Sequence, residues 1–386
     1  MSAQSDEHGE ERVVRAGRAR PAGARGHGRR RTRRRARTRR GRLLRALVYT
    51  VATVVLVAGA GLTALYVKLD GNLSGIDLDA VLGTGRPADS PNDSLDILVL
   101  GSDSRAGEHG GYGSASGARA DTSMIVHINE ARDAATVVSI PRDTLVRRPA
   151  CKRTDGGLTR AAEKTMFNSA YSVGGPACAV KTVEKLTGLR MDHFVEVDFD
   201  GFAKLVDTLG GVEVTIRQPI ADPDSRLDLP AGTHTLNGEQ SLALVRTRKS
   251  VGDGSDLGRI RLQQDFLRAL ADRVGDLGML TDPRRLFELA DTATSALTTD
   301  SDLASVSRLA SLARTLRDID GDDLRLLTLP VAYDHDDPNR VVPRERQAGQ
   351  VWQALREDRQ VPRSALRDSA AERSGEQGLV AWAQAE

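Results

Sequence analysis

Acidic and arginine side chains gather where aliphatic runs of strand type begin or end. Three pairs stand at such ends: Asp103 with Arg105 after 95–100, Arg119 with Asp121 before 122–128, and Arg142 with Asp143 after 135–140. Open α/β sheets bind ligands in the crevice outside their strand ends. Arginine donates bidentate hydrogen bonds to phosphate oxygens, and Mg²⁺ takes one or two carboxylates together with substrate phosphate oxygens. The pattern predicts a site for a pyrophosphate or a similar polyanion, with Mg²⁺.

A second group of candidates lies further along the chain. Arg246 and Arg248 are expected at another strand end, and Arg259 and Gln263 stand four apart in a helical stretch, hence on one face. Any single arginine is most simply a solvated or salt-bridged surface residue. Four or five that converge on one crevice would lack enough carboxylates to neutralise them, so the whole set favours an anionic ligand.

Several other chemistries lack their usual signatures. The chain contains no G-x-S-x-G elbow, no Walker A loop and no H-E-x-x-H motif. Its only dinucleotide-like glycine pattern, residues 59–64, lies inside a long apolar run and opens no strand–helix unit. The arginines and carboxylates at strand ends are therefore the chemistry that the sequence offers.

The elements that must position these residues mix strands and helices along the whole chain. Strands are predicted at 95–100, at 122–128 and 135–140 as a hairpin around 129–133, and at 193–197, 212–216 and 324–329. Helices are predicted at 161–173, 177–186, 199–209, 257–274, 283–290 and 303–316. Such mixing predicts an α/β fold, in which a central mixed sheet is covered by helices on both faces.

An apolar run precedes this domain. Residues 46–67 contain no charge, and as a helix they span the roughly 30 Å of bilayer hydrocarbon. Arginine clusters lie before the run, and cytoplasmic flanks are the positive ones. The alternative, a cleaved signal peptide, is disfavoured because the run exceeds an h-region of about 7–15 residues. We therefore expect an uncleaved single-pass anchor in the cell membrane, with a cytoplasmic N-terminus and a single domain outside.

Charge is distributed unevenly. Residues 1–42 hold 15 Arg and four acids, a net charge of +11; subtracting this, Arg45 and Lys68 from the whole-chain charge of +2 leaves −11 for the rest. Nucleic acid is therefore not an expected partner of the outer domain. The arginine run itself has no aromatic interleaving, so topology explains it more simply than nucleic-acid or anionic-lipid binding.

These features divide the chain into five parts. We expect a disordered basic tail at 1–42, a transmembrane helix at 43–67, a stalk at 68–94, the catalytic domain at 95–360 and a mobile C-terminal tail at 361–386. On this topology Cys151 and Cys178 lie outside the cytoplasm, where thiols are usually oxidised, so a disulfide is expected. The alternative is two buried free thiols, since no C-x-x-C motif or zinc spacing is present.

The motifs carrying these residues closely resemble those of the LytR-CpsA-Psr family of cell-wall polymer ligases. The matching stretches are ILVLGSDSR at 97–105, ARADT at 118–122, VVSIPRD at 137–143, FNSAYSVGG at 167–175, VEVDFDGFAKLVDTLGGVEV at 195–214, LPAGTHTLNGEQSLALVRTRK at 229–249 and DLGRIRLQQDFL at 256–267. Their order and spacing cover about 95–270. One departure is Leu262, where similar proteins carry an arginine; here the neighbouring arginine is Arg261.

The resemblance implies a Mg²⁺-dependent phosphotransferase that moves a glycopolymer from an undecaprenyl pyrophosphate carrier onto peptidoglycan or a related wall sugar. Asp103 and Asp121 match the family's metal-associated acids, and with Arg142 form the expected catalytic set. The expected pyrophosphate-binding residues are Arg105, Arg119, Arg142, Arg246, Arg248, Arg259, Gln263 and, through the lysine before the N-x-A-Y motif, Lys164. The general base stays open between Asp103 and Asp121, because a metal-bound carboxylate is a weak base.

Two other functions remain open at this point. A noncatalytic polyprenyl-phosphate binder or envelope regulator, such as a transcription attenuator, would use the same arginines to hold the lipid without transferring anything. A pyrophosphatase would release phosphate without an acceptor. Both differ from the transferase in their products, so an assay with purified protein separates them.

Overall fold

The computed structural model describes residues 39–102, 120–153, 156–247, 256–276, 282–317, 319, 323–367, 369–370 and 380–381. Residues up to Gly59 form one compact unit and residues from Ala60 form a second. Helix α1 (Arg39–Gly71) contains the stretch Leu44–Gly71, which is long and apolar enough to cross a membrane. It is the one such helix in the described part of the chain, and it agrees with the predicted span.

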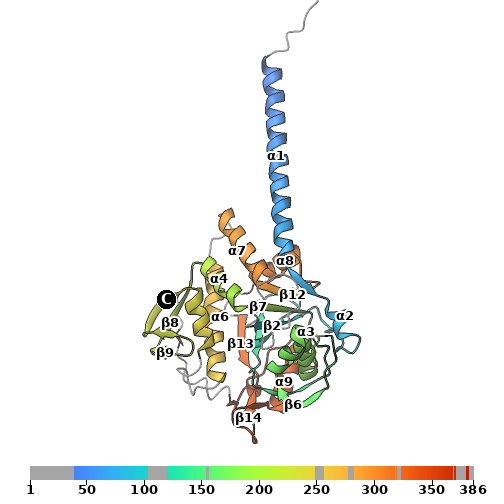
Figure 1. Ribbon diagram of the computed structural model, residues 1–386, viewed down its shortest axis with the longest axis vertical. Coiled ribbons are helices and arrows are strands. Elements are labelled where there is room, and N and C mark those ends of the chain that lie inside the picture. Colours follow the sequence, from blue (N-terminus) through green and yellow to red (C-terminus); the bar gives the residue numbers. More distant parts are fainter. Residues whose placement is uncertain are drawn as a thin grey trace, which may run out of the picture. The chain divides into compact units, whose positions relative to one another are not determined.

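The second unit is built on a mixed seven-stranded sheet (Figure 1). The strand order is β1 (Ser74–Ile76), β12 (Leu297–Asp300), β7 (His193–Asp198), β2 (Leu95–Ser102), β3 (Ala120–Ile128), β4 (Ala135–Ser139) and β13 (Leu324–Thr328). The pairs β1/β12, β7/β2 and β4/β13 are parallel, and the other neighbours are antiparallel. The predicted central sheet is confirmed, and β1 and β12 were missed.

Helices cover both faces of this sheet. Alternate residues of a strand point to opposite faces, and in β2 Leu98 belongs to the cluster buried beneath α3 (Asn168–Thr187) and α9 (Glu345–Arg356). Its neighbour Ile97 packs on the other face with Leu312 of α8 (Val306–Arg317). The predicted α/β class is therefore confirmed.

A second apolar cluster lies beside the sheet. Helices α4 (Phe199–Thr208), α5 (Gly238–Arg246) and α6 (Asp256–Asp276) bury it against β8 (Val212–Ile216), β9 (Ile220–Asp222), β10 (Leu227–Leu229) and β11 (Gly232–Leu236). The rings of Phe202 and Phe266 meet there with centroids 5.6 Å apart. The remaining elements are α2 (Leu78–Leu82), β5 (Leu145–Arg148), β6 (Ala162–Met166), α7 (Pro283–Ala296), β14 (Val331–Tyr333), β15 (Val341–Pro343), a 3₁₀ helix (Arg363–Ala365) and β16 (Val380–Ala381).

The predicted hairpin is confirmed, and Asn129 shows why the chain turns there. Its side-chain oxygen accepts hydrogen bonds from the backbone N–H groups of Asp133 and Ala134, at 3.1 and 3.0 Å. Arg132 takes the left-handed conformation, with φ of 62°. Asn is favoured in turns because its side chain satisfies backbone donors in this way.

Two predictions need correction. Residues 161–173 were expected as a helix, and 168–173 are indeed helical in α3, but β6 occupies 162–166 because it pairs with β5, a partner distant in sequence. Arg246 was expected at a strand end, but it ends helix α5. The missed signal is the capping box that starts α5, in which Asn237 and Gln240 bond each other's backbone N–H groups.

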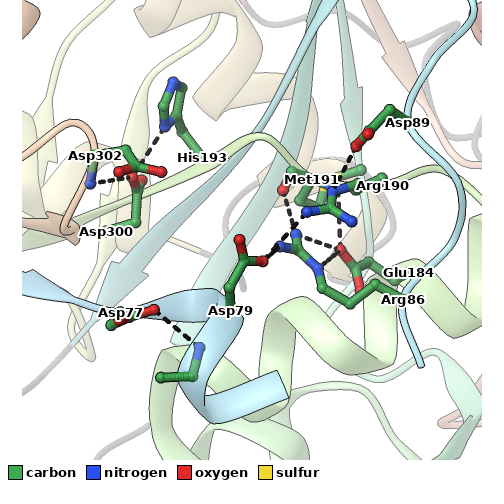
Figure 2. Close-up of polar contacts among 11 residues, drawn as sticks. Asp77, Asp79, Arg86, Asp89, Glu184, Arg190, Met191, His193, Asp300 and Asp302 are labelled. Atoms are coloured by element: carbon green, nitrogen blue, oxygen red, sulfur yellow. Dashed lines mark hydrogen bonds and ion pairs between the residues drawn. The ribbon is translucent and has the colours of Figure 1, made fainter. Parts of the chain in front are cut away.

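The predicted stalk at 68–94 is also largely wrong. Strand β1 joins the edge of the sheet, and Ile76 and Leu82 are buried in the main cluster. Arg86 lies inside the fold, where its guanidinium bonds Glu184 and the carbonyl of Met191 (Figure 2). This buried arginine holds the segment against α3, so most of the stretch belongs to the domain.

The C-terminal tail is partly ordered, and the cysteines are paired. Ala365 and Ala370 are buried in the main cluster, and β16 (Val380–Ala381) pairs with β8, so the expected mobile tail at 361–386 is wrong for these residues. The predicted disulfide between Cys151 and Cys178 is confirmed and fastens the segment after β5 to α3. The basic tail before residue 39 lies outside the described residues.

Candidate functional site

A cavity of about 280 Å³ lies between the start of β3 and the second apolar cluster. It is lined by Asp121, Thr122, Phe199, Asp222, Asp224, Ser225, Val245, Arg246, Arg259 and Gln263. Four of the predicted site residues are thereby brought together: Asp121, Arg246, Arg259 and Gln263. They come from β3, α5 and α6, which are far apart in the sequence.

Helix α6 supplies two of them from one face, as their spacing predicted. The Arg259 guanidinium donates to the backbone carbonyl of Asp121 at 3.1 Å. The amide of Gln263 donates to the Thr122 hydroxyl at 3.0 Å and to the Val245 carbonyl at 2.9 Å. Both side chains are buried, so they join the start of β3 to the end of α5 and shape the cavity wall.

Arg142 lies next to this wall and supports it. Its guanidinium bonds the Asp121 carboxylate at 2.7 Å, and its backbone N–H donates to Asp256 at 3.2 Å. Asp256 also pairs with Arg259. Arg142 is not among the lining residues, and its contacts indicate that it orients Asp121 and balances its charge.

Arg246 occupies the end of α5 and is exposed. Its guanidinium lies over the ring of Phe199, 5.1 Å from the centroid. A cation over an aromatic face is stabilised by the ring quadrupole, and a positive charge at a helix C-terminus interacts favourably with the helix dipole. Stacking engages the face of the guanidinium, while its N–H donors point along the edges, so Phe199 holds Arg246 in a geometry suited to an anion.

The sequence missed the opposite side of the cavity. Asp222 and Asp224 come from β9 and the turn after it, and Asp222 accepts a hydrogen bond from the Asp224 N–H at 3.0 Å. Ser225 beside them bonds the Thr247 hydroxyl at 2.8 Å. The stretch D-P-D-S at 222–225 predicts a turn. Its own sequence does not indicate that this turn lies beside α5 and α6.

Other predicted residues fall elsewhere. Asp103, Arg105, Arg119 and Arg248 lie outside the described residues. Lys164 lies in β6 and pairs with Asp336 at 2.8 Å and Asp334 at 3.0 Å. These two hydrogen bonds raise the pKa of Lys164. Lys164 does not line the cavity, so its expected contact with pyrophosphate has no support in this geometry.

The departure at Leu262 has a structural explanation. Leu262 is buried in the second apolar cluster, facing away from solvent. Arg261 is half-exposed and pairs with Asp265 at 3.8 Å. Residue 262 therefore contributes to packing, and Arg261 to the outer surface of α6.

A buried polar group ties α3 to the strand ends near the site. The Tyr171 hydroxyl donates to Glu196 of β7 and lies 3.1 Å from the hydroxyl of Ser102, the last residue of β2. Burial raises the pKa of Glu196. Tyr171 belongs to the N-S-A-Y stretch of the sequence, so this motif positions the strand ends.

The cavity offers the donors that a magnesium pyrophosphate needs. Asp121, Asp222 and Asp224 provide carboxylates beside the guanidinium groups of Arg246 and Arg259. Mg²⁺ uses few protein ligands and keeps phosphate or water oxygens for the rest. Among the described residues there is no cluster of three or more His, Cys, Asp or Glu suited to a metal. Asp121, Asp222 and Asp224 are the carboxylates of this lining that could contact a cation together with a phosphorylated ligand.

Known proteins are similar to this chain in sequence. "Cell wall biosynthesis protein LcpA" of Corynebacterium glutamicum is 32% identical over 324 residues, 75% of this chain and 60% of the relative. The alignment thus spans less than two thirds of that protein. "Polyisoprenyl-teichoic acid--peptidoglycan teichoic acid transferase TagT" of Bacillus subtilis is 33% identical over 254 residues, 62% of this chain and 74% of the relative.

Solved structures share the fold. The "LytR-Csp2A-Psr enzyme from Actinomyces oris" superposes with a TM-score of 0.56 and 26% identity, covering 73% of this chain and 95% of that one. "TagT bound to LIIa-WTA" gives 0.53 and 26%, covering 72% and 95%. The model of the LytR_cpsA_psr family matches residues 65–357. The chain therefore belongs to the LytR_cpsA_psr family.

Proposed function

We propose that this protein is a phosphotransferase that moves a glycopolymer from an undecaprenyl pyrophosphate carrier to peptidoglycan or a related wall sugar. The observation that carries the proposal is the cavity in which Arg246, Arg259 and Asp121 converge from three elements. Relatives named as teichoic acid transferases support the reaction class. The relative TagT, a "Polyisoprenyl-teichoic acid--peptidoglycan teichoic acid transferase", supports a polyisoprenyl-linked donor, and the structure "TagT bound to LIIa-WTA" supports binding of such a ligand by this fold.

The reaction exchanges the phosphoanhydride bond of the pyrophosphate for a new phosphate ester bond. A wall-sugar hydroxyl attacks the phosphorus nearest the polymer, a new O–P bond forms, and the bond to undecaprenyl phosphate breaks with its electron pair on the leaving phosphate. Arg246 and Arg259 donate to the phosphate oxygens and stabilise the charge that builds on them. Mg²⁺, held by Asp121 and the predicted ligand Asp103, would supply further neutralisation of those oxygens.

The proton of the attacking hydroxyl needs an acceptor. Asp121 accepts a hydrogen bond from Arg142 at 2.7 Å and is the proposed Mg²⁺ ligand, so its carboxylate is already engaged. Asp224 lines the same cavity and is exposed, where an incoming sugar can reach it. We assign Asp224 as the general base.

The anchor explains where this chemistry takes place. The arginines before residue 42 favour a cytoplasmic N-terminus, which puts the domain outside the membrane. The disulfide between Cys151 and Cys178 fits an oxidising compartment. A domain anchored at the outer face of the membrane can contact both a membrane-bound pyrophosphate donor and the cell wall.

The test is reconstitution of the full chain in lipid nanodiscs with a lipid-linked polymer, peptidoglycan and Mg²⁺. We expect linked polymer and one undecaprenyl phosphate per link, and a loss of both when Mg²⁺ is chelated. Bound lipid without any product would favour a regulator, the class suggested by the relative named "Biofilm regulatory protein A" of Streptococcus mutans. Phosphate release without an acceptor would indicate a pyrophosphatase.

A further inference from the structure

We propose that the first turns of α7, residues 283–288, dock into the surface of the lipid bilayer and orient the domain on it. This rests on the membrane anchoring in the proposed function. The segment combines exposed apolar and basic side chains with a direct connection to the end of the membrane-spanning helix. Contacts of residues 68–72 place α7 and α8 beside the C-terminal end of α1.

The connection begins one residue after the apolar run. The Lys68 ammonium pairs with Asp291 of α7 at 2.7 Å and lies 5.1 Å from the ring centroid of Phe287. Asn72 donates to the same Asp291 at 2.9 Å and to Thr294 at 3.1 Å. Lysines that flank a span place their charge at the membrane interface. Phe287, in contact with that lysine, is therefore held at headgroup level.

A further contact makes this arrangement rigid. The carboxylate of Asp70 accepts a hydrogen bond from the backbone N–H of Val306, the first residue of α8, at 3.1 Å. Lys68, Asp70 and Asn72 are each bonded to the domain. Residues 68–72 are thus fastened to both α7 and α8.

The composition of the first turn suits a lipid surface better than water. Leu286 is 44% exposed, and the Arg285 side chain is 74% exposed. Arg284 and Arg285 stand at the helix N-terminus, where the helix dipole disfavours positive charge, and Asp282 caps the backbone and, among the described residues, pairs with Arg285 alone, at 3.8 Å. At a bilayer surface the same residues are stabilising, because Leu286 and Phe287 enter the acyl boundary while the arginines meet lipid phosphates.

Docking of α7 would orient the cavity, because α7 packs on α4. Thr208 of α4 lies 3.3 Å from Thr292, and Gly201 faces Ala296 so closely that any Cβ at 201 would overlap it. The two helices are thus antiparallel and in tight contact. Helix α4 begins with Phe199, which lines the cavity and holds Arg246. If α7 is docked on the bilayer, its packing on α4 determines how the cavity is oriented toward membrane-bound donors.

Spin labels on the full chain test the position of α7. Leu286→Cys is labelled in vesicles of phosphatidylethanolamine and phosphatidylglycerol, with the native disulfide intact, and its collisions with oxygen and with a nickel chelate are measured. We expect the label about 5–10 Å below the lipid headgroups. Leu56→Cys, 73% exposed on α1, is the lipid control. Leu158→Cys, 80% exposed between β5 and β6, is the aqueous control, since Figure 1 places β6 at the other end of the domain from α7.

The outcomes separate this inference from the anchoring on which it rests. Lipid exposure at positions 286 and 56, with water exposure at 158, supports docking. Water exposure at 286 with lipid exposure at 56 overturns docking and leaves the anchor intact. Water exposure at all three positions overturns both.

A charge reversal tests the functional consequence. Arg284→Glu with Arg285→Glu is expected to lower transfer several-fold from a donor embedded in vesicles, yet to leave transfer from a water-soluble short-prenyl donor unchanged. The matched control is Arg346→Glu, an exposed arginine of α9. An equal loss with both donors would point to a damaged site, and no loss with either would show that α7 does not orient the domain; both results overturn the inference.

Discussion

Arginine and carboxylate groups meet in two regions of this molecule, around Arg86 and around the cavity. The Arg86 guanidinium is only 6% exposed, and each of its three nitrogens bonds a protein acceptor on Glu184, Asp79 or Met191 (Figure 2). Arg246 is exposed instead, stacked on Phe199 and facing an open cavity. Arg86 is thus enclosed by protein acceptors, whereas Arg246 is accessible from the cavity.

The difference teaches that clustering alone does not mark a site. Around Arg86 the charges are satisfied within the protein and hold residues 74–89 to α3, so a ligand has nothing to bind. At the cavity, side chains from β3, α5 and α6 are held by neighbours that leave a space between them. The open space lets a ligand reach the cavity residues, whereas the contacts around Arg86 leave no such space and serve to stabilise the fold.

The largest effect, on the stability of the fold, is expected from removing the buried Arg86. Arg86→Ala leaves Glu184 buried without its cation, which should lower the free energy of unfolding by about 3–5 kcal/mol. Urea denaturation measures the loss. Arg190→Ala is the control, because Arg190 is more exposed and its pairs with Asp79 and Asp89 are worth about 0–1 kcal/mol. Equal stability of the two variants would contradict the structural role of Arg86.

Substitution at the cavity should affect activity and leave stability unchanged. Arg246→Ala is expected to lower transfer by about 10²–10³-fold, since it removes a donor to the developing phosphate charge. Its unfolding midpoint should match that of the unmodified protein. The assay is transfer of polymer to peptidoglycan, normalised to folded protein. Full activity in this variant would sink the assignment of the cavity as the active site.

Asp265 of α6 is a third case: its carboxylate is buried, and the neighbouring arginines do not offset the cost of burying its charge. Burial raises its pKa to about 6 from 3.8, although Arg261, Arg268 and Arg217 oppose the shift. The folded state therefore binds the proton more tightly, and stability falls as the pH rises from about 4 to 6.

Asp265→Asn removes this titration. At pH 7 the variant should be more stable than the unmodified protein by about 2–3 kcal/mol. Below pH 3.8 the two should be alike, because both side chains are then neutral. Thermal unfolding across the pH range measures the difference, and a gap that does not depend on pH would rule out the titration of Asp265 as its cause.

The smallest effect concerns the ring beneath Arg246. Phe199→Leu removes the aromatic face and should lower transfer by about two- to fivefold. Phe199→Tyr keeps the face and should restore activity. The dependence on donor concentration identifies whether binding or turnover is affected. An unchanged rate in the leucine variant would mean that stacking does not position Arg246.

Local patterns were enough for much of the fold. The aliphatic strands at 95–100 and 135–140 and the helix at 257–274 are where their periodicity predicted them, because burial on a sheet or a helix face imposes that periodicity. The four-residue spacing of Arg259 and Gln263 also predicted their shared face correctly. A strand that depends on a distant partner was missed: β6 pairs with β5, and nothing in its own sequence predicts that pairing.

The sequence by itself determined the long apolar run, the class of the sheet and the arginines and acids available for phosphate chemistry, since these depend on composition and on contacts close in the chain. Only the tertiary structure decided which of them face a cavity. It brought Asp222 and Asp224 opposite Arg246, assigned Lys164 to two carboxylates and drew Arg86 into the core. These choices rest on approaches between residues distant in sequence, where a side chain's neighbours are set by packing and not by its own local pattern.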